Sequence, residues 1–287
     1  MSVAQAIRDA AAALATTSDT ARLDAEVLMA HALGCSRSDV LLRHMQAEAP
    51  GGFAALVERR LAHEPVAYIV GTQEFYGLDL TVSPAVLIPR GDSETLIEAA
   101  RDSLGNCPPR RVLDLGTGSG ALLLAALSIW PGAEGIGIDR SAEALAVACT
   151  NAARHAPTAS FLQADWTQGG WSDGMGQFDL ILANPPYVED AADLAPSVCG
   201  HEPAGALFAG PDGLDDYRLL VPQLPGLLAE NGIAMVEIGW TQGEAVMALA
   251  HRAGMTAILH HDLAERPRAV EMAKMRNIPL GKAGLDD

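Results

Sequence analysis

Phe178-Asp-Leu-Ile-Leu-Ala-Asn-Pro-Pro-Tyr187 is the stretch of this sequence that says most about its architecture. Phe178 to Ala183 is short, apolar and β-prone, as is typical of an interior strand of a parallel sheet. Pro185 and Pro186 lack the N–H that a strand ladder needs, and the following proline holds Asn184 in extended geometry. We therefore expect a strand that ends abruptly and presents Asn184 at the carboxyl edge of a sheet, where open α/β folds bind ligands.

The groups after this strand suit a planar amine or amide. The Asn184 side-chain oxygen and the Pro185 carbonyl are acceptors that could together hold both hydrogens of one NH2 group. The Tyr187 ring could then stack on the flat group behind it. Asn-Pro-Pro-Tyr after a hydrophobic strand resembles the signature of methyltransferases that modify exocyclic amines of bases or the side-chain amide of glutamine. A proline-rich turn without a catalytic role is the plainer alternative.

Length, composition and charge describe a folded protein with room for one large domain and a small one. The chain has 287 residues, of which 49% are hydrophobic and 19% are charged. Its net charge of −17 argues against tight binding to bare nucleic acid, which needs a basic surface. Four widely spaced cysteines without a Cys-x-x-Cys pair disfavour a zinc site, and we expect no metal. Because neither a signal peptide nor a membrane-spanning run is evident, we expect a cytoplasmic protein.

Three segments differ in pattern along the chain. We expect residues 1–64 to form a helical domain with a packing or substrate-docking role, because its apolar residues have helical spacing and it holds no catalytic set. Val66–Val70 and Phe75–Val82 are strand-like and separated by a Gly-Thr pair. Residues 65–88 are therefore predicted to be a β-hairpin linker. Residues 89–287 remain for the larger domain.

From Arg110 onward, strand-like and helix-like segments alternate, which predicts a parallel, doubly wound α/β sheet of the Rossmann-like type. Strands are expected at 112–115, 135–138, 160–163, 178–183 and 233–238, helices at 121–130, 142–154, 214–228 and 242–253, and a closing antiparallel pair at 256–260 and 268–275. The segment 188–212 has no clear period and is long for a loop, which is typical of a lid or binding segment.

Successive strand ends carry groups suited to a nucleoside. Gly116-Thr117-Gly118-Ser119-Gly120 follows the first strand and opens a helix, where glycines let the backbone approach a ligand closely. The second strand ends in Asp139, whose carboxylate can accept both hydroxyls of a ribose. The third is followed by Asp165, which could accept an adenine amino group, and Trp166, which could line the base pocket.

The glycine pattern alone also fits a dinucleotide-binding dehydrogenase, because Gly116-x-Gly118-x-x-Ala121 satisfies a loose fingerprint and Asp139 lies near the expected acidic position. A dehydrogenase would need a hydride-transfer site after the fourth strand, usually with His, Lys or Tyr. Asn184-Pro185-Pro186-Tyr187 stands there instead. The combination favours S-adenosylmethionine as the cofactor, with S-adenosylhomocysteine as the product.

Several motifs taken together resemble the bacterial peptide chain release factor glutamine methyltransferases of the HemK/PrmC type. They cover nearly the whole chain and comprise Glu64–Gly71, Glu74–Leu78, Leu87–Arg90, Asp114–Gly120, Asn184–Tyr187, Glu202–Phe208 and Asp212–Leu214. The resemblance implies a class I methyltransferase sheet with a small N-terminal helical domain. It also implies methylation of the glutamine in the Gly-Gly-Gln motif of class 1 release factors, in support of translation termination.

The resemblance implies roles for particular residues. The cofactor would be bound by Gly116–Gly120, Asp139, Trp166 and Asn184, and the substrate glutamine by Asn184, Pro185, Pro186 and Tyr187. Of these, Asn184, Pro185 and Tyr187 would be catalytic. The sequence departs from the family pattern at Pro89-Arg90-Gly91-Asp92-Ser93-Glu94, where relatives often read Pro-Arg-Pro-Glu-Thr-Glu.

Other functions stay open at this point. A close relative of the family methylates a ribosomal-protein glutamine with the same motif. A nucleic-acid amine methyltransferase shares Asn-Pro-Pro-Tyr, although we would expect a basic recognition region for it. A non-enzymatic cofactor-binding protein would require a disabled Asn184 site. We expect a monomer that acts on release factors and does not bind nucleic acid or membranes directly.

Overall fold

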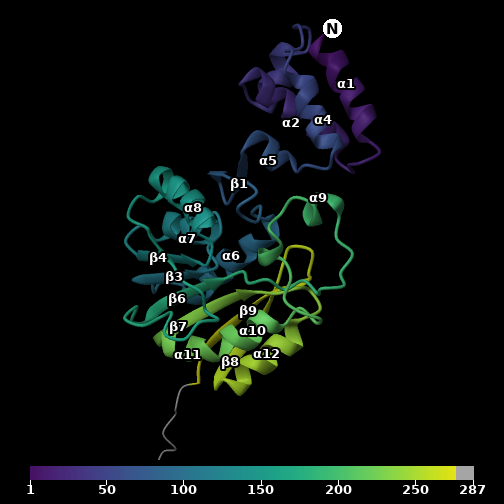
Figure 1. The fold of residues 1–287 in the computed structure, drawn as a ribbon. Helices are drawn as coiled ribbons and strands as arrows, with labels where there is room; N and C mark the ends of the chain where they lie inside the picture. The colour runs from purple at the N-terminus through teal and green to yellow at the C-terminus, as the bar shows by residue number, and fades with distance from the viewer. Residues whose placement is uncertain (276–287) are drawn as a thin grey trace, which may run out of the picture.

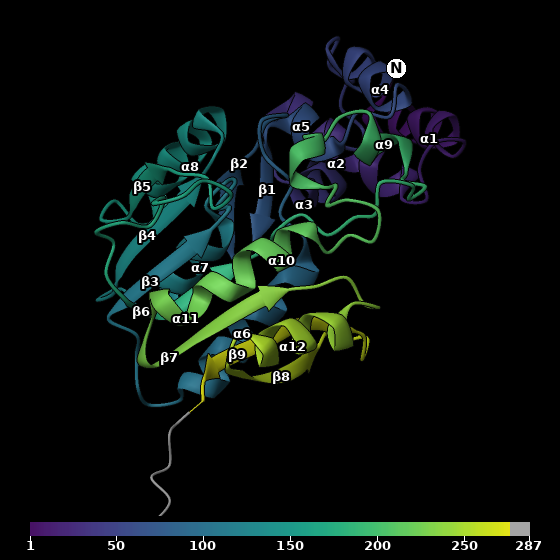
Figure 2. The same cartoon turned by 60° about the horizontal axis from the view of Figure 1, so that its bottom comes forward.

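The computed structural model describes residues 1–275, which form a small helical unit, a two-stranded hairpin and a larger α/β body (Figures 1 and 2). Residues 276–287, the end of the predicted larger domain, lie outside the described residues. In Figure 1 the helical unit lies at the top, the sheet with its helices lies below, and the hairpin lies between them.

The helical unit has a hydrophobic core of its own. Its helices are α1 (Val3–Leu14), α2 (Ala21–Leu33), α3 (Arg37–Asp39), the π-helical η1 (Val40–His44), α4 (Phe53–Leu61) and α5 (Val66–Val70). Val3, Ile7 and Leu14 are buried in α1 at helical spacing, so one face of that helix packs against α2. Gly34 ends α2 in a left-handed conformation, at φ 65°.

The prediction that Val66–Val70 is a strand was wrong, because these residues form α5. Strand propensity is overridden here by packing on two sides. Ile69 is buried in the core of the helical unit. Tyr68 is buried in a separate hydrophobic cluster, and its hydroxyl donates a hydrogen bond to the Val86 carbonyl at 2.5 Å. The hairpin therefore begins after Gly71.

The position of the hairpin turn was also predicted wrongly, because the turn lies within the predicted strand Phe75–Val82. The hairpin consists of β1 (Thr72–Phe75) and β2 (Leu78–Thr81), paired antiparallel, with Tyr76 and Gly77 at the turn. The Glu94 carboxylate accepts the Tyr76 N–H at 3.0 Å. The hairpin is thus attached to the start of α6 (Glu94–Leu104) in the α/β body.

Within the described residues, seven strands form the sheet of the α/β body. They are β3 (Arg111–Leu115), β4 (Glu134–Asp139), β5 (Ser160–Gln163), β6 (Phe178–Ala183), β7 (Leu228–Glu237), β8 (Met255–His261) and β9 (Pro267–Lys274). Their order is β5-β4-β3-β6-β7-β9-β8; the first five are parallel, and β9 is antiparallel to both neighbours. The predicted doubly wound sheet and its antiparallel closing pair are confirmed.

Helices cover both faces of this sheet (Figure 2). One face carries α6, α7 (Ala121–Ile129) and α8 (Ala142–His155); the other carries α10 (Asp215–Leu220), α11 (Leu224–Leu227) and α12 (Gly243–Arg252). In β6, Leu180 and Leu182 face the first layer, whereas Ile181 and Ala183 face the second. This alternation is the period of two that a strand buried on both faces requires.

The single helix predicted at 214–228 is interrupted in the structure. It is divided into α10, the 3-10 turn η4 (Val221–Gln223) and α11, because Pro222 and Pro225 lack the N–H for continuous helical bonding. Strand β7 then starts at Leu228, five residues earlier than predicted, with a register shift against β6.

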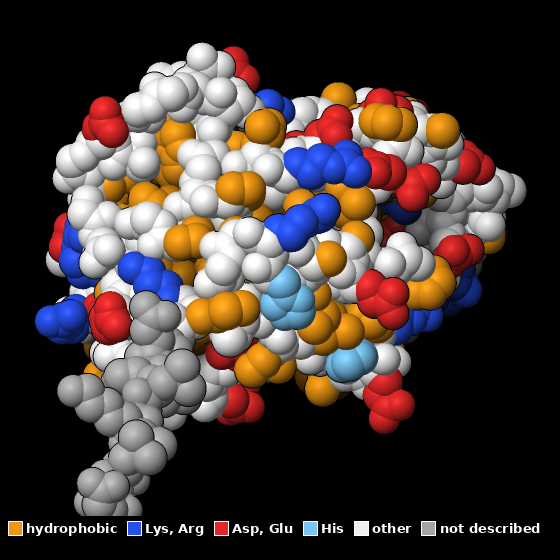
Figure 3. All heavy atoms as spheres, turned by 90° about the horizontal axis from the view of Figure 1, so that it is seen from below, with side chains coloured by type: hydrophobic (Ala, Val, Ile, Leu, Met, Phe, Trp, Pro, Cys, Tyr) orange, Lys and Arg blue, Asp and Glu red, His pale blue; other side chains and the backbone are white. Residues whose placement is uncertain are grey.

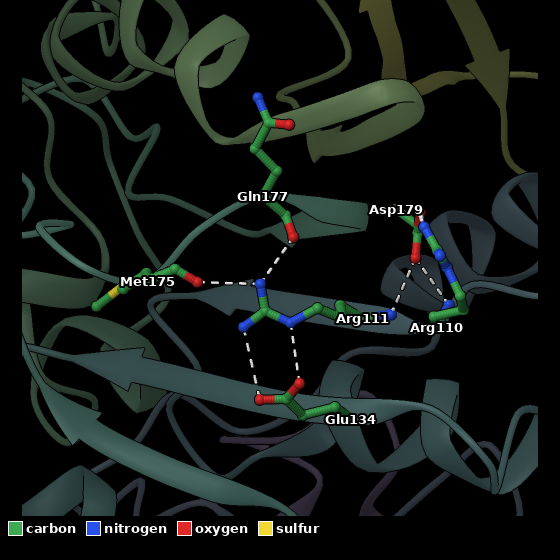
Figure 4. A network of polar contacts seen from close by, with 6 residues as sticks. All are labelled: Arg110, Arg111, Glu134, Met175, Gln177 and Asp179. Carbon is green, nitrogen blue, oxygen red and sulfur yellow. Dashed lines mark hydrogen bonds and ion pairs between the residues drawn. The ribbon is translucent and has the colours of Figure 1, made fainter.

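A polar network fixes the amino ends of three parallel strands (Figure 4). The Arg111 guanidinium donates to the Glu134 carboxylate at 2.9 Å and to the Gln177 carbonyl at 2.8 Å. Asp179 accepts the backbone N–H groups of Arg110 and Arg111 at 2.9 and 3.1 Å. These bonds join β3, β4 and β6 at the edge opposite the predicted ligand site. They fix the strand register at the amino ends, and this register aligns the carboxyl ends.

Candidate active site

A cavity of about 270 Å³ lies at the carboxyl ends of β3, β4 and β6, where the sequence predicted a ligand site. This volume is close to the roughly 300 Å³ at which small-molecule pockets begin. Most of the predicted site residues line it, namely Gly116, Thr117, Gly118, Ser119, Asp139, Asp165, Trp166, Asn184 and Pro186. Gly120, Pro185 and Tyr187 are not part of its lining.

The glycine loop runs along one wall of the cavity. Gly116 and Gly118 have φ values of 73° and 54°, which residues with a side chain rarely adopt. A Cβ atom on Gly116 would lie 3.1 Å from the Trp166 ring. The Thr117 N–H donates to the Ile138 carbonyl at 2.8 Å, which ties the loop to β4. The loop can therefore pass close to a ligand without moving.

Asp139 is the last residue of β4, and backbone groups hold both of its carboxylate oxygens. Oδ2 accepts the Gly118 N–H at 3.0 Å, and Oδ1 accepts the Ser141 N–H at 2.9 Å. Each oxygen keeps a further lone pair. Because the side chain also lines the cavity, the fixed carboxylate can still accept hydrogen bonds from ligand hydroxyls.

Asp165 and Trp166 line the cavity after β5. Asp165 accepts the Thr167 N–H at 2.9 Å, and this bond holds the pKa of its carboxyl below the usual value. The Trp166 indole N–H donates to Asp216 Oδ1 at 3.0 Å, which fixes the ring. An ionised acid beside a fixed aromatic ring suits a heteroaromatic base that carries an amino group.

The two ends of the Asn-Pro-Pro-Tyr motif point into different surroundings. Asn184 lines the cavity, and its Nδ2 donates to the Ser93 hydroxyl at 3.4 Å. The Tyr187 hydroxyl donates to Glu237 Oε1 at 3.4 Å, and its ring packs against the hydrophobic core. Burial raises the pKa of the Tyr187 hydroxyl. Stacking of this ring on a substrate group stays a prediction.

Asp114 is a cavity residue to which the sequence reasoning assigned no role. It is fully buried in β3, where Oδ2 accepts the Thr117 hydroxyl at 2.6 Å and the Leu123 N–H at 3.3 Å. Oδ1 is buried and has no hydrogen-bond partner within residues 1–275. Burial raises the pKa of this carboxyl to about 7. The sequence does contain a signal for the role of Asp114, because an acidic residue is unusual within an otherwise apolar strand.

Glu202 also lacked a predicted role, and it anchors the segment that borders the cavity. Its carboxylate accepts the Ile88 N–H at 3.1 Å and forms an ion pair with Arg90. Nearby, Arg140 donates to the Gly205 carbonyl at 2.6 Å. Pro203, Gly205 and Ala206 line the cavity, in the predicted lid segment 188–212. Glu202 lies 114 residues after Ile88 and 112 after Arg90, and Gly205 lies 65 residues after Arg140. Local sequence pattern therefore does not reveal these contacts.

No metal cluster is formed by the His, Cys, Asp and Glu side chains of residues 1–275. Over the same residues, no helix combines the length and apolar character that crossing a membrane requires.

Comparisons with known proteins match both parts of the chain. Residues 5–71 match the family model described as PrmC N-terminal domain, and residues 109–274 match the one described as methyltransferase domain. The chain is 41% identical over 262 residues to a release factor glutamine methyltransferase of Xylella fastidiosa strain Temecula1, covering 88% of this chain and 94% of the relative. It is 40% identical over 247 residues to one from Caulobacter vibrioides, covering 84% of each chain.

A solved structure with a similar fold is the hMettl16 catalytic domain in complex with MAT2A 3′UTR hairpin 6. It has a TM-score of 0.52 and 14% sequence identity, and the match covers 70% of this chain and 77% of that one. At this identity the likeness concerns the fold alone.

Proposed function

Because the chain belongs to the release factor glutamine methyltransferase family, we propose that it methylates the side-chain amide nitrogen of a release factor glutamine, with S-adenosylmethionine as methyl donor. We propose further that this glutamine is the one in the Gly-Gly-Gln motif of class 1 release factors, so that the reaction supports translation termination.

One observation carries the proposal: the amide of Asn184 lines the same cavity as the glycine loop and Asp139. An NH2 group bound at Asn184 would therefore lie beside a ligand bound along that loop. This arrangement supports transfer between two bound molecules, since proximity and alignment supply much of the rate of such reactions.

The cavity residues fit S-adenosylmethionine. Asp114 Oδ1 is a buried acceptor without a partner among the described residues, and an ammonium group would satisfy it. Asp139 fits a pair of ribose hydroxyls, and Asp165 with Trp166 fits an adenine. S-adenosylmethionine carries all of these groups and supplies an electrophilic methyl group on a sulfonium sulfur.

The protein has to make a poor nucleophile react, because the lone pair of an amide nitrogen is delocalised into its carbonyl. Asn184 Oδ1 and the Pro185 carbonyl would accept the two amide hydrogens and favour a pyramidal nitrogen. Holding the nitrogen in line is the main contribution. The two acceptors also stabilise the positive charge that develops on it. The methylated nitrogen then loses its proton to water, so no strong general base is needed.

We assign substrate docking to the helical unit of residues 1–64. We also propose that the protein acts as a monomer. The net charge of −17 favours a protein partner over a phosphate backbone. On the face seen in Figure 3, basic side chains occur singly or in small groups among acidic and hydrophobic ones.

The test is methyl transfer from labelled S-adenosylmethionine to a purified release factor, beside a copy in which the motif glutamine is changed to alanine. Label on the first and none on the second supports both the reaction and the position. Label that appears only on ribosomal protein or on DNA would agree with the proposed cofactor but contradict the proposed substrate.

A further inference from the structure

We propose that Gln242 is a positioning residue for the Asn-Pro-Pro-Tyr motif, and that it directs the Pro185 carbonyl by holding the main chain of Tyr187. The inference rests on the proposed function, because it concerns one of the two acceptors for the substrate amide. Gln242 directly precedes α12, is 9% exposed and is not part of the cavity lining. It therefore acts through the motif and not on the substrate.

The Asn-Pro-Pro-Tyr turn has few backbone groups of its own that could hold it. Pro185 and Pro186 have no N–H, so neither can donate a hydrogen bond. The turn is therefore fixed from its two ends. At one end, β6 stops at Ala183, which is still paired with β7. At the other end, the Tyr187 N–H donates to the Leu207 carbonyl at 3.2 Å.

Gln242 holds the carbonyl group at the Tyr187 end of the turn. Its Nε2 donates to the Tyr187 carbonyl at 3.0 Å and to the Gly213 carbonyl at 3.2 Å. Its Oε1 accepts the Gly239 N–H at 2.9 Å. Because a backbone N–H can only donate, this last bond identifies the oxygen of the amide. Each hydrogen of the NH2 group then has its own carbonyl, so the side chain has a single orientation.

The reach of this side chain exceeds what the start of a helix requires. The Gln242 N–H donates to the Gly239 carbonyl at 2.8 Å, and the Gln242 carbonyl accepts the Val246 N–H at 3.0 Å, which fixes the base of the side chain. The two Nε2 bonds instead reach residues 55 and 29 positions earlier in the chain. They join the segment after β6 and the segment before α10 to the end of β7.

Two glycines leave the space that this arrangement needs. A Cβ atom on Gly213 would collide with the Tyr187 carbonyl oxygen and would lie 2.8 Å from Gln242 Nε2. A Cβ atom on Gly239 would lie 2.9 Å from Gln242 Oε1. Gly213 belongs to the motif Asp212–Leu214, which the proposed mechanism does not use. The close contact between Gln242 and the Asn-Pro-Pro-Tyr turn gives that glycine a reason.

A turn held at both ends presents the Pro185 carbonyl in one direction. The proline rings fix φ at about −65°, so the ψ angles are the main freedom left between the two ends. If the Tyr187 carbonyl were released, the peptide groups between the ends could rotate, and the Pro185 oxygen would turn away from the substrate nitrogen. A displacement of about 1 Å can lower a rate by about 100-fold. The loss should fall on kcat, because the cofactor residues lie elsewhere in the cavity.

The experiment compares Gln242→Glu and Gly239→Ala with the parent enzyme. Gln242→Glu keeps an acceptor for the Gly239 N–H but removes both N–H donors, so kcat should fall by about 10- to 100-fold. Gly239→Ala keeps every polar group but presses its Cβ against Gln242 Oε1, so kcat should fall by about three- to tenfold. In both variants, the Kd for cofactor and the KM for release factor should stay within about threefold of the parent values.

Two matched controls make the same chemical changes away from the site. Gln73→Glu on β1 alters a side chain whose Nε2 donates to the carbonyl of the neighbouring Glu74 at 3.0 Å. Gly226→Ala on α11 places a Cβ where no atom of the described residues outside its own chain neighbourhood lies within 4 Å. Both controls should keep the parent kcat and the parent Kd for cofactor.

A second measurement needs neither cofactor nor release factor. The Tyr187 and Val188 N–H groups both donate to the Leu207 carbonyl. In Gln242→Glu and in Gly239→Ala, these two amide hydrogens should exchange with solvent about tenfold faster than in the parent. The amides of Leu180 and Leu182 in β6 should keep the parent rates.

The outcomes separate the inference from the proposed function. Faster exchange with parent-like kcat would overturn the positioning role, and unchanged exchange would show that Gln242 does not hold the turn. A loss of cofactor affinity as large as the loss of kcat would also overturn it, because the side chain would then act on the cofactor site. If the parent enzyme fails to label the release factor, the proposed function fails instead, and the exchange rates still test the contact.

Discussion

Replacing Glu237 by glutamine should make the protein more stable at alkaline pH. The folded-state pKa of this buried carboxyl is raised from 4.5 to about 7, mainly by burial. The folded protein therefore binds more protons than the unfolded chain between these two values. Stability conferred by the neutral acid is complete below about pH 4.5 and is lost as the pH rises through about 7. Glutamine has nearly the same shape and never ionises.

The magnitude follows from the shift. The difference between 4.5 and about 7 corresponds to about 3 kcal/mol at about 1.36 kcal/mol per pKa unit. Near pH 8 the parent carries the full cost of the buried charge, and the variant should be more stable by up to about that amount. Near pH 4 the acid is largely neutral in both states, so the difference should almost vanish. Asp114 is also buried, but it is present in both proteins, so its contribution to the difference in stability cancels.

The assay is urea unfolding followed by tryptophan fluorescence between pH 4 and pH 8. All four tryptophans lie between residues 130 and 240, so the signal reports on the α/β body. Glu271→Gln is the control of opposite sign, because a hydrogen bond from His260 lowers the pKa of the Glu271 carboxyl. It should lose stability near neutral pH. A Glu237→Gln protein that is weaker than the parent near pH 8, or a difference independent of pH, would refute the reasoning.

Three further changes test the site and the fold. Asn184→Ala should lower kcat by about 100-fold or more while cofactor affinity, measured by calorimetry, changes much less; parent-like turnover would contradict its proposed role. Arg140→Ala removes the bond to the Gly205 carbonyl, so cofactor dissociation in stopped-flow should become about tenfold faster, as the loss of about 1.5 kcal/mol predicts; an unchanged rate would show that this bond does not hold the segment. In Gly137→Ala, the new Cβ would lie 2.8 Å from the Phe161 ring, and thermal unfolding should show a loss of about 1–3 kcal/mol; a neutral effect would mean that the ring moves aside freely.

The glycine loop and the order of strands and helices could be predicted because their causes are local. The strands 160–163 and 178–183 have the bounds that their apolar runs and flanking residues indicated. Prolines stop β6 at Ala183, and Gly116 and Gly118 adopt the positive φ values that glycine permits. Such preferences act between neighbours in the chain, so they can be read before the fold is known.

What only the tertiary structure decided depends on residues far apart in sequence. Val66–Val70 reads as a strand and is a helix, whose Tyr68 and Ile69 pack into two different hydrophobic clusters. Asn184 and Tyr187 were evident as candidates, but the contact of Asn184 with Ser93, 91 residues earlier, and that of Tyr187 with Glu237 on the adjacent strand β7 were not. The sequence by itself specified which groups stand at the strand ends. Their partners were set by folding, because burial raises the cost of an unpaired polar group and so selects contacts by position in space.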